Sequence, residues 1–297
     1  MGAIMEENAG FTFTGIGTSW CILVDGEPLR EDARASILDY VQVFNERFSR
    51  FLPDSEANAF RSVVAGEYSV SEEFAILLSR ADELRRITGG LYDPAVGGLL
   101  EEAGYDAAYS MVPRSSVAQF ILPKWTIIGQ TLTIDRPVVF DIGGMGKGYC
   151  IDHVAEILES YGYRHYLVDG GGDMYGTSKH SGEPWRIALE YPGKPDLAAG
   201  IVEIKNQGLA VSDSFRRRWG EWHHIVHPFL RVPIETVVGA VAVARSAWTA
   251  DCATSSLFLS TEDRYPEVAR SLTSRFLVFR GDGTAHVSSD WEGELFL

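Results

Sequence analysis

Cysteine is scarce in this sequence, and its placement argues against two kinds of protein. The three cysteines, Cys21, Cys150 and Cys252, lie far apart in apolar surroundings. They form neither an even set for a disulfide framework nor the close pairs that bind zinc. The sequence therefore predicts buried free thiols in a reducing compartment.

Long hydrophobic runs are also missing. The longest apolar run, Val237–Ala244, is far shorter than the about 20 residues that span a bilayer. Residues 1–8 have neither the basic segment nor the apolar segment of a signal peptide. We therefore expect no membrane insertion, no signal peptide or lipoprotein anchor, and a cytoplasmic location.

Basic residues are outnumbered, with 26 Lys and Arg against 41 Asp and Glu and a formal net charge of −15. This balance argues against binding to nucleic acid or to an anionic membrane. An acidic protein that binds a phosphorylated ligand needs local compensation from a metal ion, a lysine or a helix end. The length of 297 residues allows one large domain or two small ones, and no repeat, low-complexity tract or obvious linker divides it.

Glycine, by contrast, is concentrated around one lysine. The apolar residues 138–140 end in Asp141, and four glycines and Lys147 follow within residues 143–148. Apolar residues then recur with helical spacing from Ile151 onward. This order predicts a strand, a glycine loop and a helix, and residues 166–168 then close a β-α-β unit.

Such a loop suits phosphate groups, because glycine backbone can approach a ligand closely and a helix N-terminus offers unpaired N–H donors. Lys147 adds a positive charge, while Asp141 and Asp152 can accept from ribose hydroxyls or a flavin edge, or orient a metal-bound water. The alternative is that the glycines only permit tight packing of strand and helix. Their spacing does not match the dinucleotide fingerprint Gly-x-Gly-x-x-Gly, so a Rossmann fold is not supported.

Periodicity and turn signals predict the other elements of the chain. Ser55 is a candidate cap after the first helix. The expected elements are paired strands within 11–24, helices over 30–48, 71–88 and 262–273, short strands within 117–135, antiparallel strands at 184–189 and 200–204, and a buried strand at 237–244.

Two polar clusters lie between the last two of these strands. Arg216, Arg217 and Arg218 are most simply a solvated face, but they can also receive a phosphate or an acidic partner. Residues 223–227 hold three histidines without a neighbouring cysteine. We expect one histidine to act as a base at a cleft rather than a zinc site, because adjacent strand residues face opposite ways.

A helix after the buried strand presents Asp251 and Ser255 one turn apart on one face. Hard oxygen ligands of this kind suit magnesium, which also binds substrate phosphate. The alternative is that both residues act as caps near the helix start.

Together these stretches resemble the ApbE family, the FAD:protein FMN transferases. The resemblance runs in order from Gly17 to about Leu259. It is carried by an ordered set of motifs: Phe48, Ser49, Arg50 and Phe51; Asp54, Ser55 and Glu56; Thr88 to Pro94; Asp141, Gly143, Gly144, Gly146, Lys147, Gly148 and Tyr149; Gly171, Gly172 and Asp173; Trp185, Arg186 and Ile187; His224, Ile225, Val226 and Pro228; and Ala250 and Asp251.

The resemblance implies a fold and an activity. The fold would be α+β, two-lobed and T-fold-like, with mixed or antiparallel sheets, flanking helices and a ligand cleft between the lobes, formed by a single catalytic domain over residues 1–297. The activity would be magnesium-dependent transfer of FMN from FAD to a threonine or serine hydroxyl of a partner flavoprotein, with release of AMP. FAD would be the substrate and Mg²⁺ the cofactor.

The resemblance also implies roles for individual residues. His224 would be the base that takes the proton of the acceptor hydroxyl. Flavin and adenosine contacts would come from Ile16, Phe51, Leu91, Tyr92, Asp93, Asp141, Lys147 and Val226. The metal would be bound by the carbonyl of Gly144, by Asp251 and by Ser255, with Thr254 adjacent.

The chain departs from the family pattern after His224. Where the family usually has His-x-x-Asp-Pro-x-Thr-Gly, this chain has histidine at 227, leucine at 230 and arginine at 231. Two alternatives therefore stand beside the transferase. One is hydrolysis of FAD to FMN and AMP at the same site, and the other is a flavin-binding protein without turnover.

Overall fold

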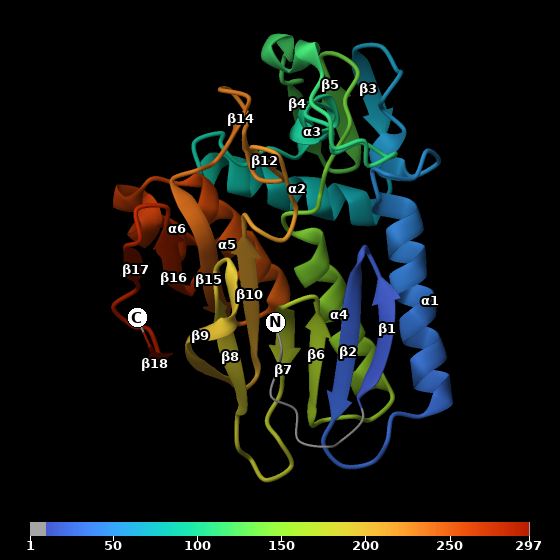
Figure 1. Cartoon of the computed structure of the whole chain (residues 1–297). Helices are drawn as coiled ribbons and strands as arrows, with labels where there is room; N and C mark the ends of the chain where they lie inside the picture. Colours follow the sequence, from blue (N-terminus) through green and yellow to red (C-terminus); the bar gives the residue numbers. More distant parts are fainter. Residues whose placement is uncertain (1–9, 297) are drawn as a thin grey trace.

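An eight-stranded antiparallel sheet forms the centre of the protein, in a computed structural model that describes residues 10–296 (Figure 1). Its strand order is β1-β2-β6-β7-β10-β15-β16-β17. The strands span Phe11–Gly15 (β1), Thr18–Val24 (β2), Tyr166–Gly170 (β6), Asp173–Gly176 (β7), Gln207–Asp213 (β10), Val237–Ala244 (β15), Arg275–Arg280 (β16) and Ala285–Val287 (β17). The predicted strand pair within 11–24 is confirmed, with Phe11 opposite Ile22.

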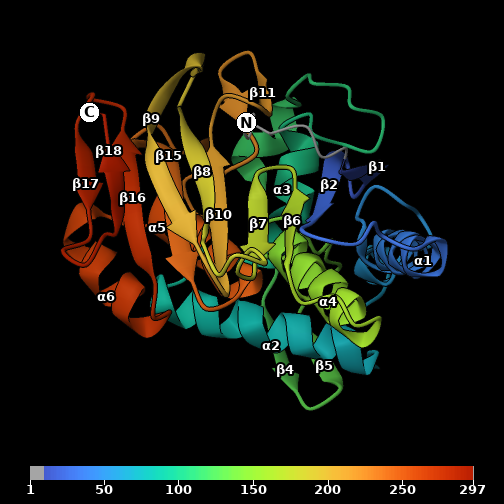
Figure 2. The ribbon, with the colours of Figure 1, turned by 90° about the horizontal axis from the view of Figure 1, so that it is seen from below.

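Helices cover one face of this sheet and a second sheet covers the other (Figure 2). The helices α1 (Glu31–Phe48), α4 (Gly146–Ser160) and α5 (Ala247–Leu259) share a core with alternate strand residues such as Val168 and Ala242. The intervening strand residues, such as Leu167 and Val243, pack against β8 (Trp185–Tyr191) and β9 (Lys194–Ile204). This alternation follows from the two-residue period of a strand. The short strand β18 (Gly293–Leu295) pairs with β9.

A smaller lobe lies above the end of the large sheet in Figure 1. It contains α2 (Glu72–Ile87), α3 (Gly97–Glu102) and a sheet of β3 (Gly66–Ser69), β5 (Thr131–Ile134) and β4 (Trp125–Ile128), with short 3₁₀ helices at Glu56–Asn58, Pro94–Val96 and Ser115–Gln119. Helix α2 begins as predicted after Ser71, whose hydroxyl accepts from the Phe74 N–H at 3.2 Å.

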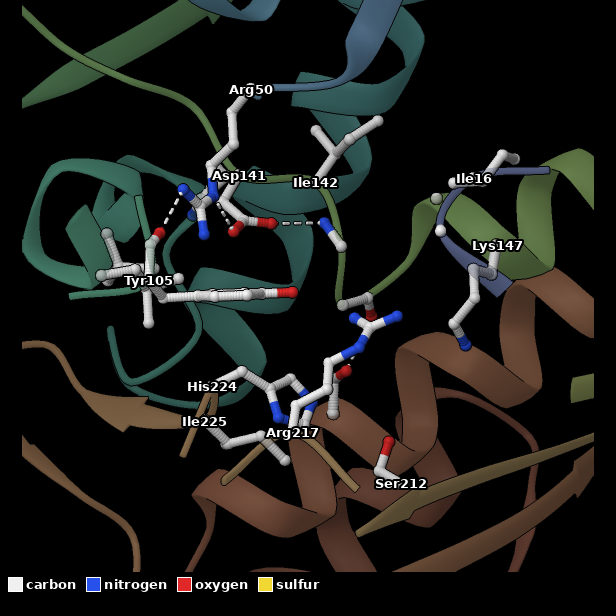
Figure 3. Close-up of a pocket in the computed structure, with 18 of the residues that line it drawn as sticks. Ile16, Arg50, Tyr105, Asp141, Ile142, Lys147, Ser212, Arg217, His224 and Ile225 are labelled. Carbon is white, nitrogen blue, oxygen red and sulfur yellow. Dashed lines mark hydrogen bonds and ion pairs between the residues drawn. The ribbon is translucent and has the colours of Figure 1, made fainter. Parts of the chain in front are cut away.

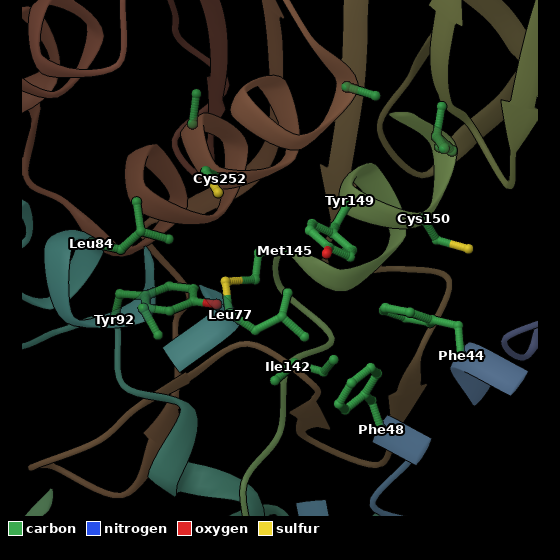
Figure 4. Close-up of a cluster of buried hydrophobic side chains, with 14 of the residues drawn as sticks. Phe44, Phe48, Leu77, Leu84, Tyr92, Ile142, Met145, Tyr149, Cys150 and Cys252 are labelled. Carbon is green, nitrogen blue, oxygen red and sulfur yellow. The ribbon is translucent and has the colours of Figure 1, made fainter. Parts of the chain in front are cut away.

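One apolar core joins the lobes. Phe44 and Phe48 from α1, Leu77 and Leu84 from α2, and Met145 before α4 converge in it (Figure 4). The two-stranded hairpins β11–β12 (Arg218–Trp219, Trp222–His223) and β13–β14 (Val226–His227, Val232–Pro233) lie over the junction between the lobes. The Trp219 indole N–H donates to the Ala103 carbonyl of the smaller lobe at 2.8 Å.

The predicted β-α-β unit is wrong. Residues 138–140 are extended and buried but belong to no strand, because their N–H groups bond to loops: Val138 to the Phe60 carbonyl at 3.0 Å and Phe140 to Ala57 at 3.3 Å. The pairs recorded within residues 10–296 are all antiparallel. Without a parallel pair, no β-α-β crossover is formed.

Two smaller expectations also need correction. Ser55 precedes the first 3₁₀ helix, but its side chain makes no capping bond. The helix expected over 262–273 is divided into a 3₁₀ turn, Glu262–Arg264, and α6, Tyr265–Ser271, with Pro266 in the first turn of α6. Within residues 10–296 no helix is both long and apolar enough to cross a membrane.

Candidate active site

A cavity of about 800 Å³ lies between the lobes (Figure 3). Twelve of the thirteen site residues predicted from the sequence line it: Ile16, Phe51, Leu91, Tyr92, Asp93, Asp141, Gly144, Lys147, His224, Val226, Asp251 and Ser255. These residues come from segments distributed over most of the chain, and the fold brings them to one place.

The cavity floor depends on close contact between α4 and α5. A Cβ atom at Gly148 would lie 2.4 Å from the Ala247 carbonyl oxygen, so only glycine fits between the helices. Asp152 accepts from the N–H groups of Ala247 at 2.8 Å and Trp248 at 3.0 Å. The idea that Asp152 contacts a ribose, a flavin or a metal-bound water is therefore corrected, since this carboxylate caps the start of α5.

Three oxygen groups that could bind a metal lie where these helices meet. The Ser255 hydroxyl donates to the Gly144 carbonyl at 2.7 Å, and Asp251 accepts from the Gly148 N–H at 2.9 Å. Burial raises the pKa of Asp251 to about 7, although the charge of Lys147 opposes this shift. Within residues 10–296 no three His, Cys, Asp or Glu side chains are grouped to hold a metal. One carboxylate with neutral oxygens is a donor set that fits magnesium, which completes its shell with water and phosphate.

Thr254 is the predicted site residue that does not line the cavity. Its side chain is fully buried. The hydroxyl donates to the Asp251 carbonyl at 3.0 Å and accepts from the Ser212 hydroxyl at 3.0 Å. Thr254 therefore connects α5 to β10 beneath the cavity.

Lys147 lies at the cavity edge and forms an ion pair with buried Asp173. Asp173 also accepts from the Val211 N–H at 3.0 Å, which fixes its position. Burial lowers the pKa of Lys147, but the carboxylates of Asp173 and Asp251 outweigh this effect and raise it above its ordinary value. The lysine therefore keeps its charge near the glycine loop.

Arg50 is a site residue whose role sequence reasoning missed, although it lies in one of the motifs quoted. Its Nε donates to Asp141 at 2.6 Å and its Nη1 donates to the Tyr105 carbonyl at 2.8 Å, while Nη2 is buried and has no partner among residues 10–296. Burial alone would raise the pKa of Asp141, but the Arg50 guanidinium and the Gly143 N–H lower it. Asp141 is thus ionised and orients the glycine loop.

Aromatic rings form one wall of the cavity. Phe51 stacks on Tyr109 with ring centres 5.2 Å apart, and Tyr105 stacks on Trp219 at 5.4 Å. The Arg50 guanidinium lies over the Phe51 ring at 4.1 Å. Tyr105 and Tyr109 follow α3 in a loop without a periodic pattern, so no sequence signal marked them. Such a wall suits a flat ring system.

Tyr92 and Asp93 belong to a turn that closes the other side. The Tyr92 hydroxyl is buried and has no partner among the described residues. Asp93 accepts from the Trp125 indole at 2.8 Å and from the Ala95 N–H at 2.9 Å. Burial raises the pKa of Asp93. Its carboxylate holds the turn in shape, and the turn presents the Tyr92 ring.

The three histidines have separate positions. His223 is buried, and its ring Nε2–H donates a hydrogen bond to the Ile234 carbonyl at 2.8 Å. His224 points into the cavity, and its Nδ1 is buried with no partner in the part of the chain that the structure describes. Burial, and then the charges of Arg217 and His223, lower the pKa of His224 to about 3. The His224 imidazole is therefore neutral and able to accept a proton.

His227 supports the β13–β14 hairpin, which contains Val226 and follows His224. Its Nδ1 accepts from the N–H groups of Phe229 at 3.3 Å and Leu230 at 3.2 Å. An aspartate can cap a turn in the same manner. The turn also holds Arg231 at φ 61°, at the position where the family usually has glycine. The hairpin is thus kept although its sequence has diverged.

We expect His227→Ala to destabilise the protein by about 1–2 kcal/mol, because two N–H groups lose their acceptor. His227→Asp should restore most of this loss, since a carboxylate can accept from the same groups. Urea unfolding of the two variants measures the difference. Equal losses in both variants would contradict a capping role for His227.

The fold and the cavity define a class of protein: a two-lobed α+β protein whose cleft suits a ligand with a flat ring system and an anionic group. This chain belongs to the ApbE family, whose family model matches residues 16–278. The predicted resemblance is therefore confirmed.

Named relatives and solved structures agree with this assignment. An FAD:protein FMN transferase of Haemophilus influenzae is 27% identical over 284 residues, covering 88% of this chain and 81% of that protein. One from Vibrio cholerae is 28% identical over 276 residues, covering 86% and 82%. The structure of the flavin transferase ApbE from Vibrio cholerae superposes with a TM-score of 0.82 at 25% identity, covering 94% of this chain and 96% of that chain. The ApbE protein of Thermotoga maritima has the same fold, with a TM-score of 0.83 at 22% identity and the same coverage. The predicted two-lobed α+β fold is confirmed.

Proposed function

We propose that this protein is a magnesium-dependent FAD:protein FMN transferase that moves FMN from FAD to a threonine or serine hydroxyl of a partner flavoprotein and releases AMP. The coarser prediction, an enzyme of the flavin transferase type, is confirmed by the family and by its named relatives. The finer statement rests on one observation. A neutral imidazole, a charged lysine and the oxygen atoms of Gly144, Asp251 and Ser255 all face a single cavity.

The oxygen set would hold the metal. Gly144, Asp251 and Ser255 would supply a carbonyl, a carboxylate and a hydroxyl. Magnesium bound there would neutralise negative charge on the diphosphate of FAD and on the departing AMP. Lys147, at the cavity edge, adds a fixed positive charge beside the same region.

His224 would act on the acceptor hydroxyl. Its imidazole accepts the hydroxyl proton while the hydroxyl oxygen bonds to the phosphorus of the FMN moiety. The bond between that phosphorus and the bridging oxygen breaks, and the electron pair leaves with AMP. The products are an FMN phosphoester on the acceptor and AMP.

The direct test is to incubate the purified protein with FAD and magnesium, with and without a flavinylation-motif peptide, and to follow AMP and peptide mass. AMP together with a peptide that gains the mass of FMN less one water, as a phosphoester requires, would support the transferase. AMP with an unmodified peptide would favour hydrolysis of FAD. FAD that binds but stays intact with every acceptor would favour a flavin-binding protein.

The acid side of the pH profile tests the lowered pKa of His224. Its pKa of about 3, against an ordinary 6.5, keeps the ring neutral throughout the usual assay range. At saturating magnesium, which holds Asp251 ionised, we therefore expect kcat/KM for the acceptor to stay level from about pH 8 to about pH 5. A tenfold loss for each pH unit below 6.5, absent from His224→Gln, would contradict this expectation.

The lowered pKa also has a consequence for stability, with a defined sign. In the unfolded chain His224 binds a proton below about pH 6.5. In the folded chain it binds one only below about pH 3. Folding is therefore favoured above this window and weakened as the pH falls through it.

A further inference from the structure

The positive charges that face the cavity are mostly neutralised within the protein. Lys147 is paired with Asp173, and Arg50 is paired with Asp141. Within residues 10–296 neither Arg217 nor Arg218 has a hydrogen bond or an ion pair, although both line the cavity; Arg217 is half-buried, whereas Arg218 is exposed.

All three adjacent arginines line the cavity, but the local backbone gives them different surroundings. Asp213 at the end of β10 accepts from the N–H groups of Phe215 at 2.7 Å and Arg216 at 2.8 Å, which turns the chain sharply. Arg216 is exposed and its charge is neutralised by Glu190 at 2.9 Å and by Asp213 at 3.3 Å. Arg218 starts β11 with an exposed side chain.

Arg217 extends past the His224 ring toward the space between Asp141 and Lys147 (Figure 3). After burial, its charge is the next influence that lowers the pKa of His224. Its charge also acts on Asp141, Lys147 and Asp251, which belong to other elements around the cavity. The guanidinium thus occupies a central position among the predicted site residues.

We propose that Arg217 binds the diphosphate group of the flavin substrate. This inference rests on the proposed function, which supplies a diphosphate beside the Gly144 and Ser255 oxygens. A guanidinium can donate two parallel N–H bonds to phosphate oxygens, and a charge-assisted pair of this kind is strong when water is excluded. An unpaired half-buried cation is also costly until an anion meets it, so this position of Arg217 favours an anionic ligand. The oxygen set and Arg217 would then approach the diphosphate from two sides.

Binding of FAD and of ADP, which share the diphosphate, tests the proposal by isothermal titration calorimetry with magnesium. We expect Arg217→Gln to raise the Kd of both ligands about ten- to a hundred-fold. Arg217→Lys, which keeps the charge but loses the paired donors, should fall between this variant and the wild type. The control is Arg270→Gln, the same change at an exposed position on α6, which should alter neither Kd by more than about twofold.

Arg217 has no hydrogen bond or ion pair with the other described residues, so thermal unfolding of Arg217→Gln should match that of the wild type. Kd values for FAD and ADP within twofold of wild type in this variant would overturn the proposal, even if the KM for the acceptor rose. An equal rise in Arg270→Gln would overturn it as well, since the effect would then be one of net charge. A wild-type protein that binds both ligands but transfers no FMN would contradict the proposed function. The Kd values of Arg217→Gln would still decide whether Arg217 binds the diphosphate. Wild-type protein that binds neither ligand would overturn both.

Discussion

Asp251→Asn is expected to reduce the rate of AMP release at least about a hundred-fold at saturating FAD and acceptor, with little change in thermal stability. Asp251 is the carboxylate of the Gly144, Asp251 and Ser255 oxygen set, so asparagine removes the charge that would hold magnesium against the diphosphate. Losses of about this size follow when one fixed group that stabilises transition-state charge is removed.

The asparagine variant separates this chemistry from folding. Its amide oxygen can still accept from the Gly148 N–H, and it removes a buried charge whose pKa is already raised by burial. Unfolding should therefore occur at the wild-type temperature or slightly above. Raising magnesium should restore part of the lost rate. Asp290→Asn, the same change at an exposed position, should leave the rate unchanged.

A rate for Asp251→Asn within about threefold of wild type would show that the carboxylate does not hold the metal. The same experiment bears on the alternatives, since hydrolysis of FAD would need the same metal. Only a flavin-binding protein without turnover has no rate to lose, and there the variant would alter flavin affinity alone.

The sequence predicted the cavity better than it predicted the strands around it. Motifs such as Thr88 to Pro94 and residues 141–149 are compact, and twelve of the thirteen residues inferred from them line one cavity. Roles remained harder to infer, because they depend on where a side chain finds its partner. Asp93 belongs to such a motif, yet its carboxylate bonds to Trp125, whose position depends on the fold of the smaller lobe.

The parts that sequence reasoning missed are contacts between distant segments. Arg50 bonds to Asp141 across ninety-one positions, and no local period reports such a pair. Residues 138–140 read as a strand because they are apolar, yet buried loop segments can be equally apolar when other loops satisfy their N–H groups. One missed part is local: Asp213 accepts from the N–H groups of Phe215 and Arg216, and this turn leads directly into Arg217 at the cavity.

Gly148→Ala is expected to destabilise the protein by about 1–3 kcal/mol and to lower activity with it. An alanine within an α-helix would ordinarily stabilise it by about 1 kcal/mol relative to glycine. Here the new methyl group would lie 2.4 Å from the Ala247 carbonyl oxygen and 2.8 Å from the Asp251 Cβ. The first of these is backbone, which cannot rotate away, so α4 and α5 must separate.

Separation of these helices would disturb the site directly, because the hydrogen bonds that join α4 to α5 also position the site residue Asp251 and the start of α5. The Gly148 N–H holds the Asp251 carboxylate, and Asp152 caps α5 through Ala247 and Trp248. Urea unfolding and AMP release of Gly148→Ala measure the two effects. Gly66→Ala is the matched control, because its Cβ would meet only Tyr68 side-chain atoms at 3.7 Å or more and its φ is ordinary. Equal stability of the two alanine variants would show that the close approach of α4 and α5 does not require glycine at position 148. Loss of both stability and activity in Gly148→Ala alone would support the helix contact as what positions the carboxylate proposed to bind the metal.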